Sequence, residues 1–435
     1  MISESIFREN DIRGTYPEEL NESVIKEIAK GIAKKCFLED VSSIVVARDG
    51  RLSGESLLTT FCNAIAQYGI DVNNIGLATS PMLYFAAKKE NSKSGIMITG
   101  SHNPKNYNGI KMVINDNSVS GSEILNLIKN DETLNDSSVG QITYSDIKEI
   151  YISEILKNID TDISELRVVI DCGNGAAGFV APELFKRMGC DVIELYSEVD
   201  GNFPNHHPDP GKLENLEDII SMVKDKNADI GFAFDGDGDR CGYVDDNGNE
   251  IFSDIMGLLL ARNFSEKYKS SKFVIDVKST GLFGSDKILK SNDASVHYWK
   301  TGHSYIKQKT SEISALAGFE RSGHYFFNKP IGRGYDDACL SAVEVCKLLD
   351  ENPGSSISDL IKNLPDTFNS PTMSPECPDN VKYEVIEKVI DMIEDRYKNK
   401  IKIADLEISS ILTINGIRFT LEDGSWGLIL SLIHI

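Results

Sequence analysis

Three short apolar runs along the chain share one outline: β-branched residues, then an aspartate, then a loop rich in glycine or serine. The runs are Ser43–Asp49, Arg167–Asp171 and Lys272–Asp276. Each run is apolar on both faces, which is typical of a buried strand. Helical patterns follow the loops, for example over 57–68 and 180–188. This order of strand, loop and helix predicts α/β units.

The three aspartates that close these runs are about one domain length apart along the chain. We therefore expect three related α/β domains with mixed sheets. The segment 365–378 holds four of the thirteen prolines, so neither a helix nor a central strand is expected to run through it. Beyond it, Val385, Val389, Met392 and Ile393 have the spacing of an amphipathic helix over 381–396.

Two weaker sequence signals indicate the other boundaries between domains. The segment 131–140 is polar and reads as a linker, and Gly248 sits in a hairpin-turn pattern near a second boundary. These signals divide the chain into three α/β domains and a smaller α+β domain, over 1–142, 143–250, 251–364 and 365–435.

The balance of charge excludes several classes of partner. Lysine plus arginine is 45 and aspartate plus glutamate is 67, so the formal net charge is −22. Such a surface repels nucleic acid and anionic membranes. We expect neither as a partner, and no obligate protein partner is implied. An anionic substrate would need a local cationic pocket.

Segments that would direct the chain to a membrane or to secretion are not evident. No apolar run approaches the ~18–20 residues of a membrane span. The first ten residues carry acidic side chains and no apolar stretch typical of a signal peptide. The eight cysteines are scattered, without a C-x-x-C pair. We interpret them as reduced structural thiols and expect a cytoplasmic protein.

The strongest local signal for chemistry is the acidic loop Asp235-Gly-Asp-Gly-Asp239, followed by Arg240. It follows a predicted strand over 228–234. Alternate residues of an extended loop point the same way, and the two glycines let the backbone fold closely around a small ion. Three carboxylates suit Mg²⁺. A plain acidic turn is the alternative; a calcium EF-hand loop is disfavoured because it needs glycine at its sixth position and glutamate at its twelfth.

A second candidate is the loop that begins Thr99-Gly-Ser-His-Asn-Pro after the apolar run 96–98. A serine on a tight turn is held outward, where its hydroxyl can be phosphorylated or attack. His102 and Lys111 lie near Ser101 in the sequence, and both can stabilise an anion. The alternative is a turn that only caps a helix.

Two later segments add polar groups. Lys300-Thr-Gly-His-Ser304 is a polar cluster, and the segment 318–324 places Glu320, Ser322 and His324 at alternate positions. Such a row suits the vicinal hydroxyls of a sugar. Lys278 and Arg13, in or beside glycine-containing loops, are candidates for phosphate contacts. A solvated loop remains the alternative for any one of these residues alone.

Taken together, these motifs resemble the phosphohexomutase superfamily, in its phosphomannomutase/phosphoglucomutase branch, over about residues 1 to 428. The serine loop, the acidic loop and the Glu-x-Ser-Gly-His segment occur in the order typical of that family, and their joint occurrence is far more specific than any one of them. The resemblance implies three α/β domains and a smaller C-terminal domain around a central cleft, with one loop from each domain.

The resemblance also implies roles for individual residues. Ser101 would be the phosphoserine, and it would bind Mg²⁺ together with Asp235, Asp237 and Asp239. Catalysis would involve Ser101, His102, Lys111 and Arg240, with His102 and Lys111 left open as the general acid/base. The substrate, a small sugar phosphate, would contact Arg13, Lys278, Thr301, Gly302, His303, Glu320, Ser322 and His324.

The activity implied is the interconversion of hexose 1-phosphate and hexose 6-phosphate, for mannose, glucose or both. It would pass through glucose 1,6-bisphosphate or mannose 1,6-bisphosphate, which also acts as activator. Three alternatives stay open at this point: a phosphoglucosamine mutase, a non-catalytic sugar-phosphate binder, and a haloacid-dehalogenase-like phosphatase with Asp235 as nucleophile. The last leaves the serine loop and the segment 320–324 unexplained.

One departure from the family pattern lies at the C-terminus. The segment 415–427 matches the lead-in to the phosphate loop of the fourth domain, but the chain then reads Leu428-Ile-Leu-Ser-Leu-Ile-His-Ile435. An Arg-x-Ser-x-Thr-Glu-Pro-like segment would be expected there. We therefore expect a fourth domain that is truncated before its phosphate-binding loop.

This departure predicts weakened catalysis by the chain of 435 residues. Charge-assisted hydrogen bonds to phosphate are worth about 1.5–3 kcal/mol each. Losing two of them would lower kcat/KM by roughly two to four decades. Steady-state mutase kinetics measure this directly, and values typical of full mutases would contradict it.

Overall fold

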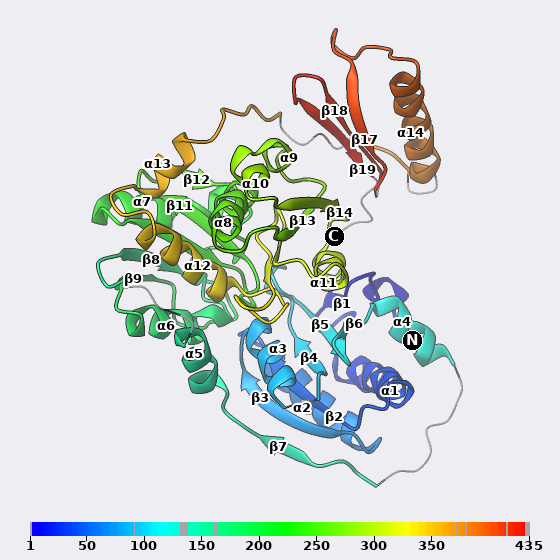
Figure 1. Cartoon of the computed structure of the whole chain (residues 1–435). Helices are drawn as coiled ribbons and strands as arrows, with labels where there is room; N and C mark the ends of the chain where they lie inside the picture. Colours follow the sequence, from blue (N-terminus) through cyan, green and yellow to red (C-terminus); the bar gives the residue numbers. More distant parts are fainter. Residues whose placement is uncertain are drawn as a thin grey trace. The chain divides into compact units, whose positions relative to one another are not determined.

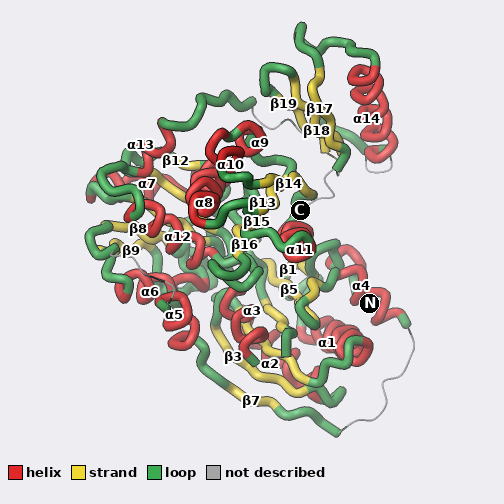
Figure 2. Tube along the Cα trace, viewed as in Figure 1, coloured by secondary structure: helices red, strands yellow, loops and turns green. Residues whose placement is uncertain are grey.

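A computed structural model describes residues 2–90, 92–130, 138–157, 159, 163–370, 373, 375–378, 381–414 and 416–430 of the chain. It divides into two compact units. The first unit comprises Met1–Ser253 and Ser322–Ser358, and the second comprises Asp254–Arg321 and Asp359–Ile435. Figures 1 and 2 show their helices and strands.

The N-terminal sheet of the first unit is mixed. Its strands run in the order β1-β5-β4-β2-β3-β7, and β6 pairs with β5. The pairs of β2 with β3 and β4, and of β3 with β7, are parallel, whereas β5 runs antiparallel to β1, β4 and β6. The strands are β1 (Ile12–Thr15), β2 (Ser43–Arg48), β3 (Asp71–Leu77), β4 (Gly95–Ile98), β5 (Tyr107–Ile114), β6 (Asn117–Ser118) and β7 (Ile142–Tyr144).

Helices cover this sheet because its central strands are apolar on both faces. Ile44 and Val46 of β2 share a core with Ile28 and Phe61, which come from α1 and α2. Val45 lies between them in the strand and is also buried, so it faces the opposite side. The elements involved are the 3-10 turn η1 (Glu4–Ile6) and helices α1 (Glu22–Leu38), α2 (Gly54–Ala66), α3 (Ser80–Lys89) and α4 (Gly121–Lys129).

The second sheet of the first unit has the order β12-β11-β10-β8-β9. Here β8 pairs in parallel with β9 and β10, while β10, β11 and β12 form an antiparallel meander. The strands are β8 (Arg167–Asp171), β9 (Asp191–Leu195), β10 (Ile230–Phe234), β11 (Cys241–Asp245) and β12 (Glu250–Ile251). The first unit also contains α5 (Lys148–Leu156), η2 (Ala176–Phe179), α6 (Ala181–Arg187), η3 (Leu213–Leu216), α7 (Glu217–Lys226), β16 (Tyr325–Phe327) and α12 (Ala338–Asp350). Helix α13 (Ile357–Lys362) spans the division between the units.

The second unit contains a parallel sheet and a small α+β region. Strand β13 (Lys272–Asp276) pairs in parallel with β14 (Ser295–Trp299) and β15 (Ala317–Phe319). Its helices are α8 (Ser253–Lys267), α9 (Leu282–Ser285), α10 (Lys287–Ser291) and α11 (His303–Glu312). The C-terminal region has helix α14 (Lys382–Lys398) and the antiparallel strands β17 (Ile408–Leu412), β18 (Gly416–Leu421) and β19 (Trp426–Leu430).

Most elements expected from the sequence are present. The three apolar runs form the expected strands β2, β8 and β13, and each pairs in parallel with its neighbours. The turn at Gly248 joins β11 to β12. Residues 131–137 of the expected linker, residues 371, 372 and 374 of the proline-rich segment, and the end of the apolar tail from 431 lie outside the described residues.

The amphipathic helix expected over 381–396 is α14, but its apolar positions are unequal. Ile393 is buried in a small core with Ile408 and Ile417. Val385 and Met392, by contrast, are 43% and 50% exposed. The periodicity therefore located the helix correctly but overestimated the width of its buried face. A three-stranded sheet can cover only a narrow stripe of a helix.

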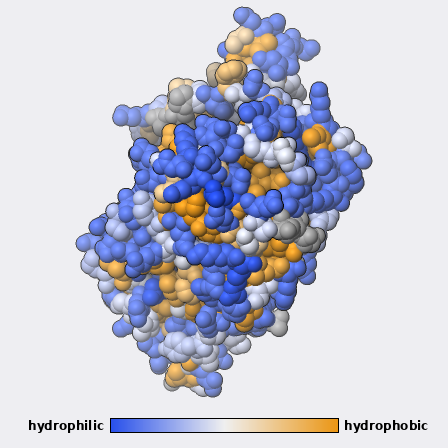
Figure 3. All heavy atoms as spheres, turned by 90° about the vertical axis from the view of Figure 1, so that its left-hand side faces the viewer, coloured by the Kyte–Doolittle hydropathy of each residue, from blue (hydrophilic) through white to orange (hydrophobic). Residues whose placement is uncertain are grey.

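The surface agrees with the acidic composition. Figure 3 shows one face on which hydrophilic residues predominate and hydrophobic residues form smaller groups between them. Among the described residues, no helix is long and apolar enough to cross a membrane. All eight cysteines are free, and all except Cys377 are buried.

Within the second unit, one arginine joins the C-terminal region to the parallel sheet. Arg418 of β18 is buried, and its Nη1 donates to the carbonyl oxygens of Val277 and Ser279 at 2.6 and 2.7 Å. Its guanidinium lies 4.3 Å from the ring centroid of Tyr298 and 3.9 Å from that of Trp426. Arg418 therefore holds the loop that follows β13 against β18 and β19.

We predict that Arg418→Ala destabilises the second unit by about 2–4 kcal/mol, because two carbonyl groups lose a charged donor and two rings lose their cation. Both tryptophans, Trp299 and Trp426, lie in this unit. Urea unfolding followed by tryptophan fluorescence therefore measures the change. Arg396→Ala is the matched control, since Arg396 also donates to a backbone carbonyl but at an exposed site. Equal losses for the two variants would contradict the prediction.

Candidate active site

The acidic loop directly follows the central strand β10 of the second sheet. The side chains of Asp235, Asp237 and Asp239 are fully buried, and one oxygen from each lies within 4.8 Å of the others. Gly238 has φ +71°, a conformation that lets the loop turn back on itself. The alternation expected from the sequence therefore does bring the three carboxylates together.

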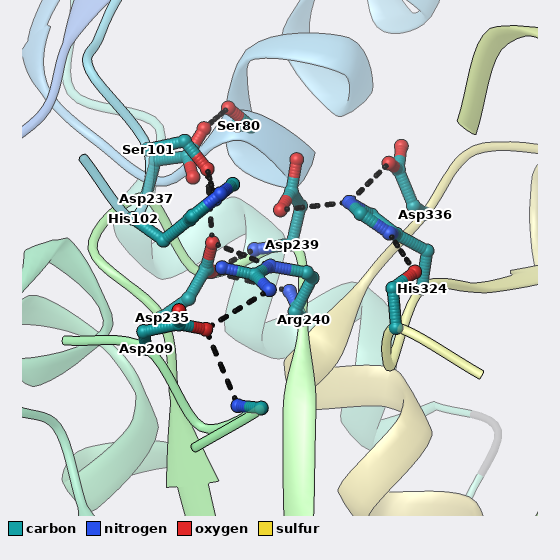
Figure 4. Close-up of polar contacts among 12 residues, drawn as sticks. Ser80, Ser101, His102, Asp209, Asp235, Asp237, Asp239, Arg240, His324 and Asp336 are labelled. Carbon is teal, nitrogen blue, oxygen red and sulfur yellow. Dashed lines mark hydrogen bonds and ion pairs between the residues drawn. The ribbon is translucent and has the colours of Figure 1, made fainter. Parts of the chain in front are cut away.

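The serine loop joins β4 to β5 in the first sheet and reaches the acidic loop. The hydroxyl of Ser101 donates to Asp235 Oδ2 at 3.1 Å, and its Oγ lies 3.2 Å from His102 Nδ1 (Figure 4). The loops approach so closely that a Cβ on Gly236 would lie 2.4 Å from the carbonyl oxygen of Ser101. The first and second sheets thus each contribute one loop to a single buried cluster.

Lys111 on β5 and Ser80 on α3 complete the surroundings of the carboxylates. Lys111 Nζ donates to Asp237 Oδ2 at 2.7 Å and also contacts Asp239 Oδ2. The Ser80 hydroxyl donates to Asp237 Oδ2 at 2.6 Å. Sequence reasoning had placed Lys111 near Ser101 but had not singled out Ser80. A serine at the start of a helix carries no sign of a carboxylate partner 157 residues away.

The cluster fits a hard divalent cation. Asp237 Oδ1 is buried and accepts no hydrogen bond from any residue that the structure describes. Burying an unpaired carboxylate oxygen is costly unless a ligand satisfies it. Three convergent carboxylates form the donor set that Mg²⁺ prefers.

Arg240 contacts a carboxylate of the cluster that Lys111 does not. Its Nε donates to Asp235 Oδ2 at 3.1 Å, and its Nη1 donates to Asp209 Oδ1 at 3.2 Å. Arg240 Nη2 is buried without a hydrogen-bond acceptor among the described residues. This donor is therefore available to an anionic ligand. Asp209 was not predicted, because one aspartate in a proline-rich loop gives no sign of the arginine that it orients.

His324 and Ser322, from the segment 318–324, also reach this cluster. His324 Nε2 lies 3.4 Å from Asp239 Oδ1 and 4.0 Å from Asp336 Oδ2. Its Nδ1 lies 3.0 Å from Ser322 Oγ. Asp336 was missed in the sequence, since the pair Asp336-Asp337 is typical of a helix N-terminus, and Asp337 is in fact the N-cap of α12.

Arg13 on β1 contacts the serine loop. It donates to Asn103 Oδ1 at 2.8 Å and to Asp11 Oδ2 at 2.5 Å. Its Nε is buried without an acceptor in the described part of the chain. Arg13, named in the sequence as a candidate for phosphate contacts, therefore lies beside the serine loop.

Burial and mutual proximity shift the protonation of these groups. Burial, with help from Asp239 and Asp237, raises the pKa of Asp235 to about 7. Burial also opposes ionisation of Asp239, yet Lys111 and His324 hold its pKa well below the usual range. The positive charge of Arg240, followed by burial, lowers the pKa of His102. At neutral pH the His102 ring is therefore uncharged.

The remaining predicted residues belong to the second unit and gather at the carboxyl ends of its parallel strands. Glu320 follows β15 and accepts a hydrogen bond from the Gly302 amide at 2.7 Å. Thr301 Oγ1 lies 3.4 Å from Asp276 Oδ2, and Lys278 is in the loop after β13. Gly302 has φ +127°, which favours glycine at the entry to α11, where His303 is the first residue. Loops at this edge of a parallel sheet commonly bind ligands.

Asp276 is a further acid in this group. It closes β13, it is buried, and it accepts a hydrogen bond from Ser279. Burial, followed by the charge of Glu320, raises its pKa to about 7. The sequence had marked Asp276 as the end of an apolar run but had assigned it no role in the site.

Comparison with known protein families decides the classification. Models of phosphoglucomutase/phosphomannomutase α/β/α domains I, II and III match residues 4–136, 149–248 and 252–368. The chain belongs to the phosphoglucomutase/phosphomannomutase family. It is a phosphohexomutase, an isomerase, with three α/β domains and a smaller C-terminal α+β domain.

Individual relatives cover nearly the whole of this phosphohexomutase. The phosphomannomutase/phosphoglucomutase of Pseudomonas syringae pv. tomato is 38% identical over 430 residues, which are 99% of the chain and 89% of the relative. The phosphoglucomutase of Neisseria gonorrhoeae is 37% identical over 429 residues, 97% of the chain and 89% of the relative. A crystal structure of a phosphoglucomutase/phosphomannomutase family protein from Burkholderia thailandensis superposes with a TM-score of 0.86 at 34% identity, covering 99% of the chain and 91% of that protein.

We predict that Asp237→Asn in this phosphohexomutase lowers Mg²⁺ affinity by about tenfold or more, because the site loses one of three carboxylate charges. Titration calorimetry with MgCl₂ measures the change. Asp245→Asn is the matched control: Asp245 is also a buried aspartate of the first unit, but it accepts hydrogen bonds only within the turn after β11 among the described residues. An unchanged affinity in Asp237→Asn would contradict the assignment.

Proposed function

We propose that this phosphohexomutase interconverts the 1-phosphates and 6-phosphates of mannose, glucose or both, with Ser101 as the residue that carries the phosphoryl group. The observation that carries the proposal is the 3.1 Å contact between Ser101 Oγ and Asp235 Oδ2, which joins the serine loop to the acidic loop. The names of the relatives, phosphomannomutase/phosphoglucomutase and phosphoglucomutase, support the same substrates.

The reaction proceeds through two successive phosphoryl transfers. A hydroxyl of the sugar monophosphate attacks the phosphorus of phosphoserine 101, so that a sugar O–P bond forms as the Ser101 Oγ–P bond breaks. The hydroxyl proton passes to a base and then to the serine oxygen. The resulting glucose or mannose 1,6-bisphosphate turns over, and its other phosphoryl group returns to Ser101, which leaves the isomeric monophosphate. Free bisphosphate would therefore also load an unphosphorylated enzyme and act as activator.

Positioning and neutralisation of charge account for most of the catalysis of phosphoryl transfer. Bound Mg²⁺, held by Asp235, Asp237, Asp239 and an oxygen of phosphoserine 101, would withdraw charge from the serine oxygen. Arg240 Nη2 and Arg13 Nε, both buried donors without an acceptor among the described residues, supply hydrogen bonds to phosphate oxygens. Lys111 adds a third positive charge.

The acid/base at the sugar hydroxyl is His102 or Lys111. The ring of His102 adjoins Ser101 Oγ, which supports it as the proton acceptor. Lys111 is held as a cation by two carboxylates, which supports it as a donor or as a fixed charge. Comparing His102→Gln with Lys111→Met by pH–rate profile separates these roles, since only loss of the titrating base removes the acidic limb of the profile.

The substrate contacts are proposed on the character of the side chains. Glu320 and Ser322 would contact sugar hydroxyls, and Lys278, His303 and His324 would contact phosphate or hydroxyl groups, with Thr301 and Gly302 shaping the loop. The buried carboxylate Asp276 beside Glu320 supports a polar ligand here.

We also propose that the domains span residues 1–142, 143–250, 251–364 and 365–435. The free cysteines support a cytoplasmic location.

Two alternative functions can each be tested directly. Phosphoglucosamine mutase is disfavoured because Arg321 stands where that branch usually carries glutamine, and activity on glucosamine phosphates would establish it. A non-catalytic sugar-phosphate binder would show a ligand-induced thermal shift without turnover. Family membership removes the phosphatase alternative.

We predict that Ser101→Ala lowers mutase turnover by on the order of 10⁴-fold or more, because no oxygen remains to accept the phosphoryl group. A coupled assay with glucose 1-phosphate and mannose 1-phosphate, Mg²⁺ and catalytic glucose 1,6-bisphosphate measures the loss. Ser120→Ala is the control. Ser120 caps helix α4, so its loss lowers stability by about 1 kcal/mol but leaves turnover intact. Full turnover by Ser101→Ala would refute the phosphoserine role.

A further inference from the structure

Arg51, which no sequence motif had singled out, is among the most completely buried large side chains of the protein. Its side chain has no exposed surface, and all of its hydrogen-bonding capacity is used. Nε donates to Asp49 Oδ2 at 3.2 Å. The two terminal nitrogens donate to four backbone carbonyls, those of Ser101, Asn103, Pro104 and Tyr107, at 2.6–2.8 Å.

All four of these carbonyl groups belong to the serine loop or to the first residue of β5. A guanidinium group has five N–H donors in a fixed plane, and here five acceptors surround it. Gly100 packs against its face, since a Cβ on Gly100 would lie 2.5 Å from Arg51 Cζ. This contact, rather than a positive φ, explains the glycine before Ser101.

The conformation that Arg51 stabilises is one that serine rarely adopts. Ser101 has φ +47°, in the left-handed region. Such a residue costs of order 1–3 kcal/mol and persists only when its surroundings hold it. With its carbonyl bound to Arg51, Ser101 directs its hydroxyl to Asp235 on the opposite side.

A second set of contacts holds the amide side of the same loop. Asp49 accepts from the Thr99 hydroxyl at 2.7 Å, and Thr99 Oγ1 in turn accepts from the Ser101 amide at 2.8 Å. Asp49 also accepts from Arg51, so one buried carboxylate orients both the guanidinium and the threonine. The carbonyl and the amide of Ser101 are thus both fixed by the β2–α2 loop.

Residues 199–203, which follow β9 of the second sheet, pack against Arg51 and the β2–α2 loop. The Phe203 ring lies 5.3 Å from Arg51 Cζ, and Gly201 packs so closely that a Cβ there would lie 2.6 Å from Gly50 O. The same connection continues to Asp209, which orients Arg240. Both loops of the active site are therefore supported from one connected group of contacts.

We propose that Arg51 is a positioning residue for phosphoryl transfer: it holds the serine loop in the strained conformation that aims Ser101 Oγ at the acidic loop. This inference rests on the proposed function. Arg51 donates hydrogen bonds to Asp49 and to four backbone carbonyls of the described chain, and none of them belongs to the three clustered aspartates. It therefore acts through Ser101. Lysine at this position keeps the charge but has three donors in place of five, and it cannot bridge the four carbonyls.

The test uses the full chain with Arg51→Lys, Thr99→Val, the double variant and the wild type. Unphosphorylated protein is mixed with glucose 1,6-bisphosphate and Mg²⁺, and transfer to Ser101 is followed by intact mass. We expect Arg51→Lys to slow this transfer about 100-fold, since a small misplacement of a reacting group costs that much. In turnover, kcat falls while KM for glucose 1-phosphate stays within about threefold, because Arg51 does not contact the substrate. Thr99→Val should slow transfer in the same way, and the double variant should lose less than the product of the two effects.

A second readout reports on the loop without needing any activity. Hydrogen exchange of peptides covering residues 99–107 should accelerate in Arg51→Lys, while exchange in the rest of the first unit stays as in the wild type. Lys34→Met is the matched control. Lys34 is another buried cation of the first unit that donates to backbone carbonyls, those of Leu127 and Asn130, away from the serine loop. It should lose stability but keep the rate of phosphoryl transfer.

The results of these experiments either support or overturn the positioning role of Arg51. Transfer at the wild-type rate in Arg51→Lys and Thr99→Val overturns the proposal, and so does an equal slowing in Lys34→Met, which would reduce the effect to lost stability. If Arg51→Lys does not fold, Thr99→Val decides. If the wild type takes up no phosphoryl group even at saturating bisphosphate and after incubation long enough to allow for the slowing predicted above, the proposed function is wrong. The exchange experiment then decides alone: faster exchange confined to 99–107 supports Arg51 as the support of this loop, and unchanged exchange overturns it.

Discussion

The burial of three like charges is the constraint on which the active site depends. Asp235, Asp237 and Asp239 have no exposed surface, and an unpaired charge in such a place would be very unfavourable. The protein offsets this with Lys111 and Arg240, which bind different members of the trio. Two carboxylate oxygens, Asp237 Oδ1 and Asp239 Oδ1, still accept no hydrogen bond from the described residues, and this unmet demand fits the cluster to a cation.

This arrangement explains why the two sheets of the first unit must share an interface through their loops. Lys111 and Ser101 come from the first sheet, whereas the carboxylates and Arg240 come from the second. The close approach of Gly236 to the Ser101 carbonyl leaves no room for a side chain. Ser101 and its charged neighbours are therefore positioned both by this close backbone packing and by the buried side chains that hold the serine loop.

In the second unit, the polar residues are brought together by the loops at one edge of the parallel sheet. Its three parallel strands end at one edge, and the loops there bring Glu320, Gly302 and Asp276 into hydrogen-bonding or electrostatic contact. Lys278 lies in the loop whose carbonyl groups are bound by Arg418. The small C-terminal region thus takes part in holding a loop of the proposed substrate site, even though its own core is small.

The sequence by itself determined the α/β fold class and supplied the residues proposed to carry the chemistry, because apolar periodicity and short motifs such as Asp235-Gly-Asp-Gly-Asp239 are local properties. It could not identify Ser80, Asp209 or Arg51, whose partners lie from 31 to 157 residues away along the chain. Hydrogen bonds over such separations depend on which strands become neighbours, and pairing of strands is decided only when the apolar faces pack. The strain at Ser101 has the same origin: no local signal predicts φ +47° for a serine, and only the surrounding buried donors and acceptors make it stable.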